Sequence, residues 1–300
     1  MQRKIIYFVN PILASIGKES LVKKIVERTH QQSIPFEILD TNPQGNYFYL
    51  KEKIDTENIT DIVICGGDEM INQVAGTLMD TDINIGILPL GSGNSLALSA
   101  KISNQIDKAL EIIFTGKAAY VDAFRINDSF SCMFCGFGFD ARIVHDFAKE
   151  KKRGLLTCIS LCFGNFIIAR PYPFEIINRG KSFTTEAYFI SISNTNRFGK
   201  CIHIAPEAKL NDGLLDIVVL KKMNKFRMLF ALLNQNYRGK VRDYCEADFH
   251  KQHILYFQTD KLIIHNLAGT PLHVDGKPAF SGKKFMIEII PDAFKLIQPR

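Results

Sequence analysis

The chain lacks the features that would assign it to an exported, membrane-spanning or low-complexity class of protein. Its 300 residues contain no low-complexity tract, and no separate apolar segment with a small-residue cleavage site follows the N-terminal MQRKIIYFVNP. The longest uncharged stretches, Ile83 to Ala100 and Gly154 to Ala169, are interrupted by proline, glycine, serine or asparagine. Neither offers the ~20 apolar residues of a spanning helix. We therefore expect a cytoplasmic protein without a transmembrane segment.

Cysteine gives no sign of a disulfide framework or a metal centre. The chain has seven cysteines, an odd number that favours reduced, mostly buried thiols. Cys132 and Cys135 form one Cys-x-x-Cys, but no second Cys or His pair lies at zinc-like spacing. A metal or redox role for this pair is the less favoured alternative.

The charge of the chain bears on which partners it could bind. A formal net charge of +6 is mild, and the basic residues do not alternate with aromatic residues along one stripe, so we expect no nucleic-acid partner. A modest attraction to an anionic membrane surface is compatible with this charge; peripheral membrane association and a homodimer both stay open. With 46% hydrophobic and 23% charged residues, the chain is long enough for two cores, and we expect two domains.

Residues 1–125 alternate strand and helix signals in the way that is typical of parallel βαβ units. The expected strands are the apolar runs Ile5 to Val9, Phe36 to Leu39, Ile62 to Cys65 and Ile85 to Leu90. The expected helices carry apolar residues at helical spacing in Leu21 to Val26, Ile71 to Leu78 and Ile106 to Ile113. This half predicts an α/β domain with an open, mostly parallel sheet.

Residues 126–300 are richer in strand and turn signals. The change to this strand-rich pattern begins at about Tyr120. The expected strands are Val121 to Asp128, Ala187 to Ser193, Leu215 to Leu220 and Lys261 to His265. Two helical patterns interrupt them, Asp140 to Phe166 in pieces and Lys225 to Leu233. The pattern predicts a β-rich, sandwich-like C-terminal domain. Because no Pro- or Gly-rich linker separates the halves, we expect a cleft between two tightly coupled domains.

Two glycine-rich turns follow expected strands and precede expected helices: Cys65-Gly66-Gly67-Asp68 and Leu90-Gly91-Ser92-Gly93-Asn94. Glycine lets backbone amides approach a ligand closely, and the start of a helix favours negative charge, so such turns can bind phosphate. Together with Asn10-Pro11, they should lie at the carboxyl edge of the sheet, where open α/β folds place ligands. A tight connection without a ligand is the simpler alternative for either turn alone.

Further motifs follow these turns in chain order. They are Val121-Asp122, Gly136-Phe137-Gly138-Phe139-Asp140-Ala141, Lys152-Arg153-Gly154 and the segment Ile204-Ala205-Pro206 to Asn211-Asp212-Gly213-Leu214-Leu215-Asp216. With Asn10-Pro11, Gly66-Gly67-Asp68-x-x-Ile71-Asn72 and Pro89 to Asn94, this order resembles the diacylglycerol kinase catalytic family over nearly the whole length. That family includes bacterial lipid kinases and the sphingosine kinases, and it is related in fold to the NAD kinases.

The resemblance implies an ATP site and two roles for Mg²⁺. The implied nucleotide contacts are Asn10, Pro11, Thr41, Gly66, Gly67, Asp68, Glu69, Met70, Ile71, Asn72, Gly91, Ser92, Gly93 and Asn94. Asp68 would act near the transferred phosphoryl group through Mg²⁺, with Asp122 in the same metal network. A second, structural Mg²⁺ would take oxygen ligands from Lys209, Asp212 and Leu214, which suits a hard cation. An ordinary turn is the alternative at Asp212-Gly213.

The sequence departs from the family pattern in two places. Glu69-Met70 replaces Gly-Thr, and a side chain at a position that needs positive φ would cost about 1–2 kcal/mol; alternatively, Glu69 simply begins a helix and faces solvent. Asp275-Gly276-Lys277-Pro278 resembles the family's Asp-Gly-Glu-Pro but carries Lys277 where the catalytic carboxylate is expected. A lysine ammonium cannot accept a proton. Lys277 would act as a base only if buried; it would otherwise stabilise phosphate charge, and Asp275 is a candidate substitute base.

These observations support three hypotheses for function. The first is an ATP-dependent lipid kinase, with the uncharged segment Leu155 to Ala169 either lining a lipid-accepting cleft or forming an ordinary core helix. The second is a weak or inactive homologue that binds nucleotide or lipid as a regulatory protein, for which Glu69, Met70 and Lys277 are the evidence. The third, an NAD kinase, is less favoured because the second half follows the lipid kinase pattern.

Overall fold

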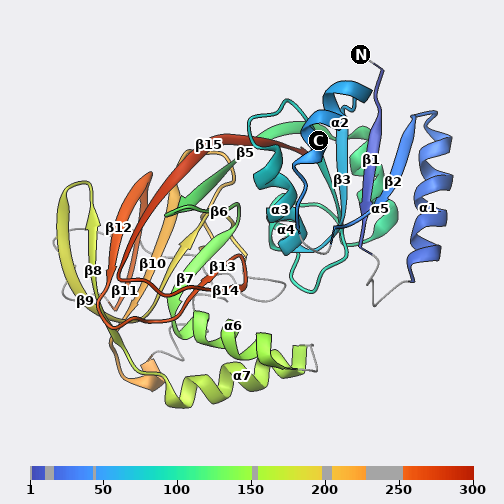
Figure 1. Ribbon diagram of the computed structural model, residues 1–300. Helices are drawn as coiled ribbons and strands as arrows, with labels where there is room; N and C mark the ends of the chain where they lie inside the picture. The colour runs from blue at the N-terminus through green and yellow to red at the C-terminus, as the bar shows by residue number, and fades with distance from the viewer. Residues whose placement is uncertain (1, 11–16, 43–44, 151–154, 198–204, 228–252) are drawn as a thin grey trace. The chain divides into compact units, whose positions relative to one another are not determined.

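The computed structural model describes residues 2–10, 17–42, 45–150, 155–197, 205–227 and 253–300. The chain divides into two compact units. Unit 1 comprises Met1–Asp122 and Pro291–Arg300, and unit 2 comprises Ala123–Ile290. Figure 1 shows alternating strands and helices in unit 1, and mainly strands with two longer helices in unit 2. This confirms the expected combination of an α/β part and a β-rich part.

Unit 1 is built from alternating strands and helices. In chain order they are β1 (Ile5–Val9), α1 (Lys18–Gln31), β2 (Phe36–Asp40), α2 (Tyr49–Glu57), β3 (Asp61–Gly66), α3 (Asp68–Leu78), β4 (Asn84–Pro89), α4 (Ser95–Ser99) and α5 (Ile106–Thr115). β5 (Lys117–Ile126) leaves unit 1, and the end of β15 (Lys284–Gln298) returns to it.

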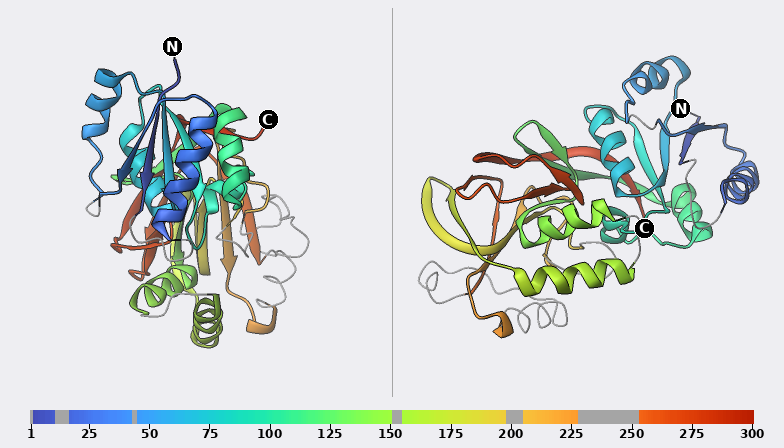
Figure 2. Two further views of the ribbon diagram at one scale, coloured as in Figure 1. Left: turned by 90° about the vertical axis from the view of Figure 1, so that its right-hand side faces the viewer. Right: turned by 60° about the horizontal axis from the view of Figure 1, so that its bottom comes forward.

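The sheet of unit 1 is parallel, with strand order β15-β4-β3-β1-β2. All five residues of β1 and all six of β3 are buried. Such continuous apolar runs are what a parallel sheet covered on both faces requires. Figure 2 shows helices on both faces of this sheet. β1 pairs with β2 on one side and with β3 on the other. Because the chain continues from β1 to opposite sides of the sheet, a topological switch point lies at the carboxyl ends of β1 and β3.

The helices of unit 1 bury one apolar stripe each. In α1 the buried residues are Leu21, Ile25 and Thr29, one helical turn apart, and the hydroxyl groups of Thr29 and Tyr7 lie 2.9 Å from each other. α3 packs against β3 and α5 packs against β4. The C-terminal strand β15 pairs with β4 at one side of the sheet. The local sequence patterns do not reveal this contact.

Unit 2 contains most of the antiparallel strands. They are β6 (Ser129–Ser131), β7 (Phe134–Gly138), β8 (Tyr172–Asn178), β9 (Lys181–Ser193), β10 (Leu215–Lys221), β11 (Ile254–Thr259), β12 (Lys261–Asn266), β13 (Leu272–Val274) and β14 (Lys277–Ala279), with the start of β15. Its helices are α6 (Phe139–Lys149) and α7 (Leu155–Ile168). The expected helical pieces between Asp140 and Phe166 are these two helices.

The 13-residue strand β9 organises the core of unit 2. Its first half pairs with β8, whereas its second half pairs with β7 on one edge and β10 on the other. The side chains between these strands form one buried cluster around Phe137, Ile190 and Ile217. A long strand that changes partners along its length is how antiparallel sheets turn into a sandwich, as the sequence predicted.

Some sequence predictions fall outside the described residues, namely those on Pro11, Lys152-Arg153-Gly154, Ile204 and the greater part of Lys225 to Leu233. Within the described ranges, no helix combines the length and the apolar content that a bilayer crossing needs. Cys65, Cys132 and Cys135 are buried and form no disulfide, in agreement with the expectation for those three residues.

Gly138, at the junction between β7 and α6, occupies a position that only glycine fits without strain, and this can be tested. Gly138 has φ +100°, and a Cβ there would lie 2.3 Å from the Tyr188 carbonyl oxygen. Gly180 also has positive φ, +76°, but no atom lies within 4 Å of the Cβ position. We expect Gly180→Ala to cost about 1–2 kcal/mol from backbone strain alone, and Gly138→Ala to cost at least about 2 kcal/mol more. Urea unfolding followed by circular dichroism measures both, and equal losses for the two variants would contradict the steric account.

Candidate functional site

The carboxyl edge of the unit 1 sheet gathers most of the residues predicted to bind nucleotide. In the parallel register Val9 lies beside Cys65, and Gly66 lies beside Pro89, so β1, β3 and β4 end at the same level. The Asn10 N–H donates to the Cys65 carbonyl at 3.4 Å, and the Thr41 N–H donates to the Val9 carbonyl at 3.1 Å. The ends of β1, β2, β3 and β4 therefore meet at the topological switch point.

The two glycine-rich turns touch each other at this edge. A Cβ added to Gly91 would lie 2.6 Å from the Gly67 Cα, and one added to Gly67 would lie 3.0 Å from the Gly91 Cα. Neither glycine has positive φ, so close approach of two backbones, rather than turn conformation, is what requires glycine here. The prediction that both turns share one edge is confirmed, while the cleft between domains stays a prediction.

Asn94 closes the second turn. It is buried with φ 58°, a left-handed conformation that asparagine tolerates better than most residues. Its Oδ1 accepts a hydrogen bond from the Gly91 N–H at 2.9 Å, and its Nδ2 donates to Asn104 Oδ1 at 3.1 Å. Gly91 and Asn94 are thereby held in one rigid loop, with Ser92 exposed at its tip.

Asp68 connects the two turns. Its Oδ2 accepts a hydrogen bond from the Ser95 N–H at 2.9 Å. Although the residue as a whole is partly exposed, Oδ1 is buried and has no hydrogen-bond partner among the described residues. Burial raises the pKa of the Asp68 carboxyl group, and backbone N–H groups around Ser95 act in the opposite direction. A buried carboxylate oxygen with capacity to spare fits a hard cation such as Mg²⁺.

The residues that depart from the family pattern take different positions. Glu69 is exposed in the first turn of α3 and does not have positive φ, so the backbone strain considered from the sequence is absent, and the alternative that it begins a helix is correct. Met70 and Ile71 are buried. The Met70 sulfur lies 2.8 Å from where a Cβ on Gly66 would be, so this side chain packs beneath the first turn instead of facing the edge. Asn72 is partly exposed on α3.

In unit 2, Asp275 anchors a loop. It is buried at the β13–β14 turn with φ 45°. Its Oδ1 accepts from Ser131 Oγ at 2.7 Å and from the N–H groups of Met133 and Phe134 at 3.2 and 2.9 Å, and its Oδ2 accepts from the Cys132 N–H at 3.3 Å. Four donors occupy this carboxylate, which favours a positioning role over that of a base. Its catalytic assignment stays a prediction.

Lys277 lies two residues further on, in β14, and is exposed. The burial that a lysine base would require is therefore absent, while stabilisation of phosphate charge stays a prediction. The same hairpin carries a buried pair that sequence patterns alone did not indicate: His273 Nε2 lies 3.3 Å from Asp140 Oδ2. A Cβ on Gly136 would come within 2.0 Å of that oxygen, so the glycine makes room for the pair. The feature of the sequence that could have indicated this pair is the motif from Gly136 to Ala141, which contains both the glycine and Asp140.

The residues predicted to bind metal belong to both units: Asp122 to unit 1, and Lys209, Asp212 and Leu214 to unit 2. Asp122 is buried in β5, and its Oδ1 accepts the Asp292 N–H at 2.9 Å. In unit 2, Asp212 Oδ1 accepts the Leu214 N–H at 3.2 Å in the turn that also contains Lys209. Among the described residues, no three His, Cys, Asp or Glu side chains converge as a metal cluster. Any cation at Asp212 would thus depend on backbone carbonyl oxygens, as the family resemblance implies.

Asp216 adds negative charge near that turn. It is fully buried, and Tyr256 donates its hydroxyl hydrogen to Asp216 Oδ1. Burial is the main cause that raises the pKa of the Asp216 carboxyl group to about 6, and the nearby carboxylates of Asp212 and Glu207 raise it further. A cation in the turn would relieve this accumulation of negative charge. The metal role of Lys209, Asp212 and Leu214 nevertheless stays a prediction.

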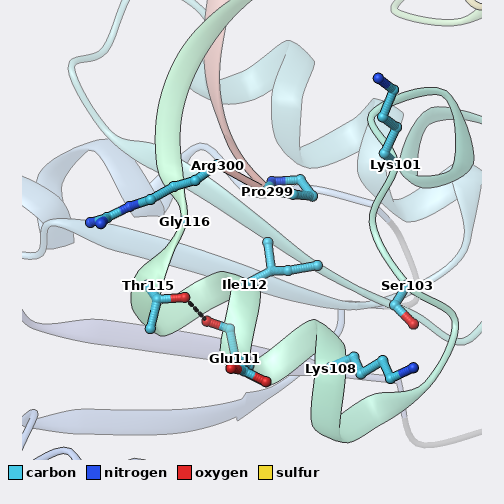
Figure 3. A pocket seen from close by; sticks show the side chains of 9 residues that line it. All are labelled: Lys101, Ser103, Lys108, Glu111, Ile112, Thr115, Gly116, Pro299 and Arg300. Atoms are coloured by element: carbon cyan, nitrogen blue, oxygen red, sulfur yellow. Dashed lines mark hydrogen bonds between the residues drawn. The ribbon is translucent and has the colours of Figure 1, made fainter.

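A cavity of about 380 Å³ in unit 1 is distinct from the two turns. Figure 3 shows its lining residues, which come from the segment after α4, from α5 and from the last two residues of the chain. Lys101, Lys108 and Arg300 give it a positive lining, with Glu111 among them. None of the residues predicted to bind nucleotide lines it, so it does not contribute to the candidate site.

Comparisons with known proteins agree with this geometry. Residues 4–126 match the family described as the diacylglycerol kinase catalytic domain, and residues 135–298 match the YegS C-terminal NAD kinase beta sandwich-like domain. A protein of Salmonella arizonae named Probable lipid kinase YegS is 31% identical over 252 residues, which cover 80% of this chain and 79% of that protein. One of Shewanella frigidimarina named Probable lipid kinase YegS-like is 29% identical over 81% of this chain and 78% of that protein.

A solved structure shows the same fold. The crystal structure of a diacylglycerol kinase from Bacillus anthracis str. Sterne has a TM-score of 0.74 and 19% sequence identity, covering 99% of this chain and 97% of that chain. The two family matches follow one another along the chain, the first over most of unit 1 and the second over most of unit 2. The chain therefore belongs to the family of lipid kinase-like proteins that join a diacylglycerol kinase catalytic domain to a YegS C-terminal domain.

Proposed function

We propose that this protein is an ATP-dependent lipid kinase that transfers the terminal phosphoryl group of ATP to the hydroxyl group of a diacylglycerol-like lipid, with Mg²⁺. The single observation that carries the proposal is the direct contact of the turns at Gly67 and Gly91, with Asp68 joined to the second turn through the Ser95 N–H. The names of its relatives in Salmonella and Shewanella, both given as lipid kinases, support the substrate class. We place its action in the cytoplasm, at the face of a membrane.

Each part of the site has a separate task in this proposal. The glycine turns hold the nucleotide phosphates against backbone N–H groups, because no side chain stands between the ligand and the main chain. Mg²⁺ would neutralise phosphate charge, and Asp68 would hold it with its buried carboxylate oxygen. Asp122, whose Oδ1 accepts the Asp292 N–H, would contribute to the same metal network.

The acceptor hydroxyl must lose a proton as its oxygen bonds to phosphorus, and the family pattern provides a carboxylate for this at the position of Lys277. In this chain Lys277 is exposed, and Asp275, the other candidate, has four hydrogen-bond donors on its carboxylate. These observations favour a second candidate function, a weak or inactive homologue that binds nucleotide or lipid as a regulatory protein. The two candidates share the nucleotide site and differ only in turnover.

Replacement of Asp68 by asparagine tests the metal role. We expect Asp68→Asn to weaken Mg²⁺-dependent ATP binding at least about tenfold in titration calorimetry, because the amide removes the charge that holds the cation. Burial raises the pKa of the wild-type carboxyl group, so the folded state binds this proton more tightly than the unfolded state. The ionised group therefore reduces stability above that pKa, and Asp68→Asn should be as stable as wild type or more stable at pH 7.5.

Thermal unfolding at several pH values checks the second part. Any gain in stability from Asp68→Asn should disappear as the pH falls toward the carboxyl pKa of the unfolded chain, about 4. Asp55→Asn, an exposed change on α2, is the matched control and should alter neither binding nor stability. An Asp68→Asn variant with an unchanged dependence on Mg²⁺ would remove the metal role from this residue.

Replacement of Lys277 by glutamate separates the two candidate functions. We expect the wild-type protein to be a slow lipid kinase and Lys277→Glu to raise the initial rate of phospholipid formation by about 10²-fold, the lower end of what a general base contributes. Lys283→Glu makes the same charge change at another exposed position and should have no such effect. Fast wild-type turnover that Lys277→Glu abolishes would give the lysine its own catalytic role and would exclude the weak-homologue candidate.

A further inference from the structure

Glu69 takes a position at the carboxyl edge of the unit 1 sheet that can be read from the helix that carries it. It is exposed in the first turn of α3, directly after Asp68. Successive residues of an α-helix point about 100° apart, so the two carboxylates are directed to different sides of the helix start. Asp68 accepts the Ser95 N–H and therefore faces the second glycine turn, which follows β4. Glu69 is directed to another side.

The side of α3 that carries Glu69 lies against residues 45–47, which precede α2. Gln73, four residues after Glu69, is on the same side of the helix. A Cβ added to Gly45 would lie 2.8 Å from Gln73 Nε2, so these two residues are in contact. Tyr47 is buried, and its ring packs edge-on against Phe8 of β1 with 5.6 Å between the ring centroids. Because α3 begins at the carboxyl edge, Glu69 lies closer to this edge than Gln73.

Electrostatics gives the same placement. Burial raises the pKa of the Tyr47 hydroxyl group, a hydrogen bond with the Asn42 main chain acts in the opposite direction, and the charge of Glu69 adds to the increase. Glu69 is therefore near Tyr47. The Thr41 N–H donates to the Val9 carbonyl at 3.1 Å, so the residue that follows β2 by one lies over the end of β1. Glu69 thus projects from the first glycine turn toward the ends of β1 and β2.

The course of a bound nucleotide along this edge follows from the strand order β4-β3-β1-β2. Its phosphates would lie at Gly67 and Gly91, and the predicted contacts Asn10 and Thr41 follow β1 and β2. Neighbouring strands are about 4.8 Å apart, so the ligand would extend over roughly 10 Å from the turns toward β2. The ribose joins the phosphates to the base. It would therefore pass over the end of β1, on the side to which Glu69 is directed.

The chemistry of a carboxylate favours the ribose among the three parts of a nucleotide. Phosphate groups are negative and repel the Glu69 carboxylate. A ribose is uncharged and presents two neighbouring hydroxyl groups. An ionised carboxylate only accepts hydrogen bonds, and its two oxygens can accept from both hydroxyl groups. Dinucleotide-binding α/β folds use an acidic residue on the ribose in the same way.

We propose that Glu69 is a specificity-determining residue that binds the ribose 2′- and 3′-hydroxyl groups of the nucleotide. This inference rests on the proposed function, since it assumes a nucleotide at the glycine turns. The departure from glycine at this position would then add selection of ribonucleotides over deoxyribonucleotides. Asp68 and Glu69 have different tasks in this arrangement, the first at the cation beside the phosphates and the second at the sugar.

The binding of deoxynucleotides measures this selection directly. In titration calorimetry with Mg²⁺ and without lipid, wild-type protein should bind 2′-deoxy-ATP and 3′-deoxy-ATP at least about tenfold more weakly than ATP, because each lacks one hydrogen bond to a charged acceptor. Glu69→Gly should reduce this ratio to less than about threefold, because the acceptor is gone. Glu69→Gln keeps an acceptor oxygen without the charge and should give an intermediate ratio. Each ratio compares ligands on one variant, so a change in folding stability cancels.

Glu52→Gln is the matched control, because Glu52 is also an exposed acidic residue in the first turn of a helix, α2. It should leave the ratio at its wild-type value. Wild-type protein that binds ATP and both deoxynucleotides equally would overturn this inference alone and leave the proposed function standing.

Two further results would also overturn the inference. Tighter ATP binding by Glu69→Gly than by wild type would show that the carboxylate repels the phosphates. A change in the ratio of ATP to GTP, without a change in the ratios for the deoxynucleotides, would assign Glu69 to the base. Absence of ATP binding by wild type and Glu69→Gly alike would overturn the proposed function and this inference with it.

Discussion

The contact between the backbones of Gly67 and Gly91 is the constraint on which the α/β unit depends. β3 and β4 are adjacent parallel strands, so both must leave the sheet through the same small volume before a helix begins. A Cβ on either glycine would come within 3.0 Å of the other's Cα. Asn94 then holds the second turn, and Asp68 ties it to the first through the Ser95 N–H. A phosphate-sized ligand could approach the main chain of both turns closely here, because neither Gly67 nor Gly91 carries a side chain.

This arrangement has an electrostatic consequence. Asp68 joins two turns that must stay close, yet its Oδ1 is buried without a partner among the described residues. Burial without a hydrogen bond disfavours the ionised carboxylate, which is why its pKa is raised. Functional sites often keep such locally unfavourable groups because a ligand compensates them when it binds. Under the proposed function, the stability of the fold and the binding of a nucleotide with its cation therefore make opposite demands on this residue.

In unit 2 the hydrogen bonds, rather than the motif, decide what a carboxylate can do. Asp275 satisfies four donors of the segment from Ser131 to Phe134, which holds the β13–β14 turn in place but leaves its oxygens committed. Lys277 is exposed on the same hairpin. The hairpin is thus preserved as a scaffold although the carboxylate expected on it is missing. An active enzyme and a weak homologue would need this scaffold equally.

The amino-acid sequence by itself determined the alternation of strands and helices in the first half, the β-rich second half and the order of the glycine turns, because these depend on local periodicity and on turn residues. It also showed where the family pattern is broken. Tertiary structure alone decided that Glu69 adds no strain, that Met70 is buried under the first turn and that β15 returns to the first unit. It also decided which face of the uncharged helix α7 is exposed. Each of these depends on contacts between residues far apart in the chain, and a helix without a polar face carries no local signal for the side that packs.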